Sequence, residues 1–128
     1  MNKKKILIVD DEVELVELMS IRLKASGYEV VAMHDGENVL EKTRAEKPDL
    51  IILDIMLPKV DGYKICVSLK ENTAFRKIPV ILLTAKDPAH DADQIQASGA
   101  DECFIKPFEH KQLLAKIREL IKMSSQDS

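Results

Sequence analysis

Three aspartates, a threonine and a lysine stand at the ends of strand-like apolar runs in this 128-residue chain. KILIVDD ends on Asp10 and Asp11, DLIILD on Asp54, IPVILLT on Thr84, and CFIKP contains Lys106. Carboxylate oxygens suit Mg²⁺, and a carboxylate beside such an ion can attack phosphorus to form an acyl phosphate. A hydroxyl and an ammonium group can bind phosphoryl oxygens. If the fold brings these groups together, they predict a phosphoryl-accepting site.

The elements that must position them alternate regularly along the chain. Apolar runs of strand length are separated by helix-period stretches, which predicts an α/β fold with a parallel sheet and helices on both faces. The carboxyl ends of parallel strands share one edge, where such folds bind ligands, so the polar groups are expected to meet there. The expected strands lie near 5–10, 28–33, 49–54, 78–84 and 102–106, and the expected helices near 12–26, 36–47, 62–72, 88–98 and 108–122.

Helix-ending residues and the tail set the boundaries. Gly27 and Gly99 stand just past the first and fourth expected helices, where a left-handed residue is usual. Residues 1–123 are expected to form one domain. The polar residues 124–128 have nothing to bury and are expected to lack regular structure.

Composition restricts the partners and the location. Nineteen basic and 22 acidic residues give a formal net charge of −3, which argues against direct nucleic-acid binding. No run reaches the roughly 20 apolar residues of a spanning helix, and the first residues do not form a signal peptide, so a cytoplasmic protein without membrane contact is expected. The spacing of Cys66 and Cys103 favours two reduced thiols over a disulfide or metal site.

The chain resembles the receiver domains of two-component response regulators over nearly its whole length. The matching stretches are ILIVDDE, LIILDIMLPKVDG, ILLTA and GADECFIKPF. The resemblance implies a flavodoxin-like, five-stranded sheet of order 2-1-3-4-5, the order described for a chemotaxis member of the family. It also implies phosphorylation by a histidine kinase or histidine phosphotransfer protein, without turnover as an enzyme. The implied surface for a downstream protein comprises the fourth helix, fifth strand and fifth helix.

The same resemblance assigns the metal and acceptor residues. Asp54 would be the residue that accepts the phosphoryl group. Asp11 would be a Mg²⁺ ligand with Asp10 assisting, and the main-chain carbonyl of Met56 would be a further ligand.

It also assigns the residues that respond to phosphorylation. Thr84 would follow the phosphoryl group, Lys106 would bind it directly, and the bond between Lys106 and Pro107 would be cis. Receivers usually have Tyr or Phe three residues before this lysine, whereas this chain has Cys103. Phe104 cannot replace that ring, because adjacent strand residues point to opposite faces. We therefore expect the fourth helix and the loop before it to transmit the signal with little help from position 103.

Three alternative functions make different demands on the same residues. In a flavodoxin-like redox protein the first loop must hold a flavin phosphate, and the acidic segment DDEVE would repel it. A phosphatase that works through an aspartyl phosphate would need an acid two residues after the nucleophile, where this chain has Met56. An interaction module with the receiver shape that signals without phosphate stays open.

Overall fold

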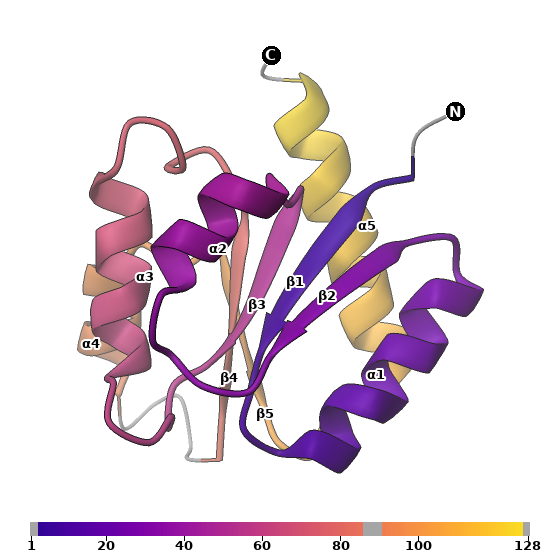
Figure 1. Cartoon of the computed structure of the whole chain (residues 1–128), viewed down its shortest axis with the longest axis horizontal. Coiled ribbons are helices and arrows are strands. Elements are labelled where there is room, and N and C mark those ends of the chain that lie inside the picture. Colours follow the sequence, from indigo (N-terminus) through magenta and orange to yellow (C-terminus); the bar gives the residue numbers. More distant parts are fainter. Residues whose placement is uncertain (1–2, 86–90, 127–128) are drawn as a thin grey trace.

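The computed structural model describes residues 3–85 and 91–126 and places five parallel strands in one sheet (Figure 1). The strand order is β2-β1-β3-β4-β5, as the family resemblance implied. This order confirms the predicted α/β fold. The strands are β1 (Lys5–Val9), β2 (Glu29–Met33), β3 (Leu50–Asp54), β4 (Val80–Thr84) and β5 (Glu102–Ile105).

Helices cover both faces of the sheet. In Figure 1, α1 and α5 lie on one side, and α2, α3 and α4 lie on the other. Their bounds are α1 (Val13–Ala25), α2 (Val39–Glu46), α3 (Gly62–Glu71), α4 (Ala92–Ser98) and α5 (His110–Gln126). Within the described ranges, no helix is long and apolar enough to cross a membrane.

The core consists of two apolar layers separated by the sheet. Because strand side chains alternate, Leu7 and Val9 of β1 pack in the layer beneath α2 and α3. Their neighbours Ile6 and Ile8 pack in the layer beneath α1 and α5. All five residues of β3 are buried, as are those of β4, so the central strands are fixed from both sides.

Two helices begin or end away from their predicted positions. The second begins at Val39 rather than at residue 36, because Asn38 is left-handed (φ 64°) and Glu37 N–H bonds Asp35 Oδ1 at 3.0 Å. This local turn competes with the helix for the same backbone groups.

The last helix continues to Gln126, so the prediction that residues 124–128 lack regular structure is wrong for 124–126. Ser124 Oγ donates a 3.4 Å hydrogen bond to the carbonyl oxygen of Lys77, which gives this turn a partner that its polar sequence does not reveal.

The predicted glycine positions are confirmed. Gly27 and Gly99 have φ values of 98° and 79°, in the region that glycine adopts without steric cost. Gly99 directly follows α4, which begins at Ala92; the predicted start at residue 88 lies outside the described residues.

Candidate functional site

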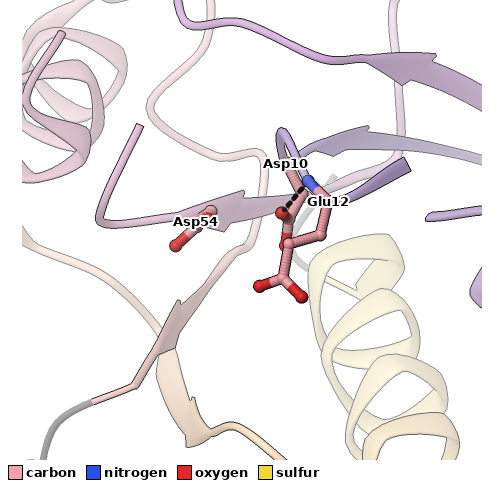
Figure 2. Close-up of side chains that lie close together, drawn as sticks. All are labelled: Asp10, Glu12 and Asp54. Carbon is pink, nitrogen blue, oxygen red and sulfur yellow. Dashed lines mark hydrogen bonds between the residues drawn. The ribbon is translucent and has the colours of Figure 1, made fainter. Parts of the chain in front are cut away.

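Two of the predicted carboxylates meet at the carboxyl edge of the sheet. Strands β1 and β3 are paired neighbours, with Val9 opposite Leu53. Asp10 and Asp54 are the next residue in each segment, so they lie side by side at the carboxyl edge of the sheet. Figure 2 shows these side chains with Glu12. One carboxylate oxygen from each of the three residues lies within 4.8 Å of the others. Asp10 is 0% exposed and Asp54 is 4% exposed, so the sheet itself fixes both groups.

Lys106 is the cation of this cluster. Its Nζ lies 2.9 Å from Asp10 Oδ2, 2.6 Å from Glu12 Oε1 and 3.3 Å from Asp54 Oδ2. Burial alone would lower the lysine pKa, but the hydrogen bonds with Glu12 and Asp10 and the charges of Asp10 and Asp54 outweigh burial and raise it. Lys106 is therefore an ammonium ion at neutral pH. The bond between Lys106 and Pro107 is cis, as the resemblance implied.

The Asp54 carboxyl is held between opposing influences. Burial and the nearby charge of Asp10 raise its pKa, whereas the Met56 N–H, which donates to Oδ1 at 3.0 Å, and the Lys106 ammonium lower it. The net shift is upward, because burial is the largest effect. One ammonium group does not compensate three carboxylates, so the site favours a further cation.

The donor set fits a hard divalent cation. Asp10 Oδ2 is fully buried, and its charged partner is the Lys106 ammonium 2.9 Å away. Buried carboxylates are costly unless cations balance their charge, and a metal ion would supply charge that Lys106 alone does not. Mg²⁺ typically takes one or two carboxylates and completes its shell with water and phosphate oxygens. This site matches that preference, because two of its carboxylates are buried and Glu12 is exposed.

Glu12 is the residue that sequence reasoning missed, and it stands where Asp11 was expected. Asp11 is exposed and is not part of the cluster of mutually close carboxylates, so its role as a ligand stays a prediction. Glu12 precedes α1, and its side chain turns back toward Lys106. The signal was present in the third acidic residue of ILIVDDE, because the loop after a strand also faces this edge.

Thr84 closes the other side of Asp54. It is 2% exposed, ends β4, and follows Leu83, which is opposite Asp54 in the sheet. Thr84 lines a cleft of about 450 Å³. Met56 and Tyr63 also line this cleft, and the Met56 side chain is 56% exposed. Asp54 therefore lies between the carboxylates on one side and a cleft with room for movement on the other.

A close approach of backbones fixes the loop after Asp54. A Cβ added at Gly62 would lie 2.5 Å from the carbonyl oxygen of Asp54 and 2.6 Å from the Cα of Ile55. Gly62 N–H donates to the Ile55 carbonyl at 3.1 Å. The start of α3 thus packs directly against the end of β3, which only glycine permits.

Comparison with known proteins adds to the geometry. The family model described as "Response regulator receiver domain" matches residues 6–118. The chain is 42% identical over 121 residues to the alkaline phosphatase synthesis transcriptional regulatory protein PhoP of Bacillus subtilis, covering 94% of this chain and 50% of that protein. It is 41% identical to the DNA-binding dual master transcriptional regulator RpaA of Synechocystis, covering 92% of this chain and 49% of that protein. The chain thus spans about half the length of these relatives.

Solved structures agree with the observed fold. A CheY-like receiver domain protein from Methanospirillum hungatei superimposes with a TM-score of 0.91 at 26% identity, covering 99% of this chain and 100% of the other. The BeF3-activated receiver domain of Klebsiella pneumoniae RstA gives 0.85 at 32% identity, covering 92% and 98%.

Proposed function

Because this chain belongs to the response regulator receiver domain family, we propose that it accepts a phosphoryl group on Asp54 from a phosphohistidine. The donor would be a histidine kinase or a histidine phosphotransfer protein. The observation that carries the proposal is the nearly buried Asp54 carboxylate, 3.3 Å from the Lys106 ammonium and within 4.8 Å of a carboxylate oxygen of Asp10. In the transfer, the bond from Asp54 oxygen to phosphorus forms as the bond from phosphorus to imidazole nitrogen breaks.

The residues of this edge divide the remaining work. Asp10, Asp11, Asp54 and the Met56 carbonyl are the proposed Mg²⁺ ligands, and the observed cluster adds Glu12 to them. Bound Mg²⁺ would neutralise charge on the transferring group.

Lys106 and Thr84 would bind the phosphoryl group. Lys106 already contacts Asp54 Oδ2, so it can bind a phosphoryl oxygen there with a small movement. Thr84 can donate its hydroxyl to another phosphoryl oxygen.

The product of this chemistry would be a change in affinity for a protein partner rather than enzymatic turnover. Hydrogen bonds to charged groups contribute roughly 1.5–3 kcal/mol each, and shifting a population from about 1:99 to 99:1 needs about 5.5 kcal/mol. Phosphorylation would therefore bias α4, β5 and α5 toward an active arrangement that the partner completes. The relatives' names describe transcriptional regulators, so we propose gene regulation as the pathway. The net charge of −3 favours a protein over nucleic acid as the direct partner of this chain.

The test is intact-mass analysis after incubation with Mg²⁺ and acetyl phosphate, for the wild type and Asp54→Asn. A Mg²⁺-dependent, hydroxylamine-labile phosphoryl adduct is expected in the wild type and absent in the variant. An adduct that persists in Asp54→Asn would reject Asp54 as the acceptor. No adduct with either acetyl phosphate or a phosphorylated histidine kinase would favour the interaction module that signals without phosphate.

A further inference from the structure

A tyrosine hydroxyl links the start of α3 to the start of α4. Tyr63 lies in the first turn of α3 and is 8% exposed. Its hydroxyl donates a 3.2 Å hydrogen bond to Oδ2 of Asp91, the residue directly before α4. This bond holds together two segments that are 28 residues apart in the sequence.

The backbone beside this tyrosine packs against the end of β3, the strand that ends on Asp54. The tyrosine N–H donates to Asp61 Oδ1 at 2.8 Å, and the adjacent Gly62 packs against the Asp54 backbone. Its side chain also lines the cleft of about 450 Å³ that Thr84 and Met56 share. A movement of Thr84 toward Asp54 would therefore change the wall of the cleft that the tyrosine occupies.

Cys103 lies close to this pair. Burial, Glu102 and Asp91 raise the pKa of the Cys103 thiol to about 11. Burial, Asp91 and Cys103 are among the causes that raise the Tyr63 pKa to about 12. Cys103 also packs against the apolar layer that contains Tyr63. Because position 103 is a cysteine, Tyr63 supplies the aromatic ring in the group formed by Tyr63, Asp91 and Cys103.

We propose that Tyr63, instead of a residue at position 103, is the aromatic group that couples the Asp54 site to α4. The hydrogen bond from Tyr63 to Asp91 stabilises the resting arrangement and breaks when Thr84 moves toward a phosphoryl group on Asp54. Packed interfaces change between discrete arrangements, so a small shift of Thr84 is enough to release the start of α4. This inference rests on the proposed function of Asp54.

The first test is ¹⁹F NMR of protein in which both tyrosines are replaced by 3-fluorotyrosine, titrated with Mg²⁺ and beryllofluoride as the phosphoryl analogue. Tyr63→Phe assigns the two tyrosine signals. Tyr28 packs in the layer on the opposite face of the sheet and is an internal control. The same spectrum shows bound beryllofluoride, so binding and the tyrosine response are read together.

Three outcomes are distinguishable. A Tyr63 signal that shifts in proportion to bound beryllofluoride, with Tyr28 unmoved, supports the coupling. Bound beryllofluoride with an unmoved Tyr63 signal overturns the coupling and leaves the proposed function intact. If no beryllofluoride binds, the proposed function fails, and the coupling fails with it.

The second test measures beryllofluoride affinity in variants. Tyr63→Phe keeps the buried ring but removes a hydrogen bond from the resting state, so its dissociation constant should fall about two- to tenfold. Asp91→Asn keeps an acceptor oxygen and should change the constant less, and Tyr28→Phe should leave it unchanged. An unchanged or weaker affinity for beryllofluoride in Tyr63→Phe would overturn the proposal that the hydrogen bond from Tyr63 to Asp91 stabilises the resting arrangement.

Discussion

Strand β3 and helix α4 differ sharply in how the rest of the molecule holds them. All five residues of β3 are buried, and the strand ends on Asp54. In α4, by contrast, Ser98 is the buried residue among seven. Resistance to local opening depends on buried apolar contacts, so β3 should be rigid and α4 easy to displace. The proposed chemistry would thus take place on a rigid strand, and the proposed response would take place on a weakly held helix.

Removing the cation of the rigid region should have the largest effect on stability. Lys106→Met leaves the buried Asp10 and Asp54 carboxylates uncompensated, and breaking a buried ion pair costs about 3–5 kcal/mol. Chemical denaturation in EDTA should show this loss in the free energy of unfolding. Saturating Mg²⁺ should restore part of it, because a metal ion would replace the missing charge.

The matched control is Lys116→Met. Lys116 pairs with Glu102 and Glu119 at distances of 3.3 and 2.7 Å, but at the surface, where such pairs contribute about 1 kcal/mol or less. Equal losses for the two variants, or no response of Lys106→Met to Mg²⁺, would contradict the charge argument.

The junction between the two regions should be the next most sensitive position. Gly62→Ala would place a Cβ 2.5 Å from the Asp54 carbonyl oxygen, so the start of α3 must move away from β3. Overpacking of this kind costs about 1–3 kcal/mol. The first measurement is the midpoint of denaturant unfolding. The second is the ¹⁹F NMR signal of fluorinated Tyr63, which should shift because Tyr63 directly follows residue 62.

Gly36→Ala tests whether the backbone contact is responsible. A Cβ at Gly36 would meet side-chain atoms of Ile65 and Val60 at 3.0 Å, and side chains can yield more readily than backbone. A smaller loss of stability is expected there. A larger loss at Gly36 than at Gly62 would show that the contact with β3 is not critical.

The same contrast explains what the sequence could and could not predict. Central strands were readable because burial on both faces produces continuous apolar runs, and the strand order placed Asp10, Asp54 and Lys106 at one edge. Asp11 and Glu12 lie beyond the strand, where side-chain direction depends on loop dihedrals rather than on strand alternation. That is why the close third carboxylate proved to be Glu12.

The contact between Tyr63 and Asp91 could not be predicted from the sequence for a different reason. It joins helices whose separation is set by packing against the sheet, and neither residue has a periodic pattern that indicates the other. The late start of α2 is a similar case, because the left-handed Asn38 depends on a turn rather than on helix propensity.

The smallest expected effect is on the titration of the Tyr63 hydroxyl, which is hydrogen-bonded to the start of α4. Burial and the hydrogen bond to Asp91 raise the Tyr63 pKa from 10.0 to about 12. The folded state therefore retains this proton longer than the unfolded state. The stability it contributes is complete below about pH 10 and is lost as the pH rises through about 12.

Tyrosinate absorbance, recorded while circular dichroism shows that the protein is folded, measures this titration directly. The absorbance change that disappears in Tyr63→Phe should be centred near pH 12, and the change that disappears in Tyr28→Phe serves as the comparison. A midpoint near pH 10 would contradict both the burial of the Tyr63 hydroxyl and its hydrogen bond to Asp91.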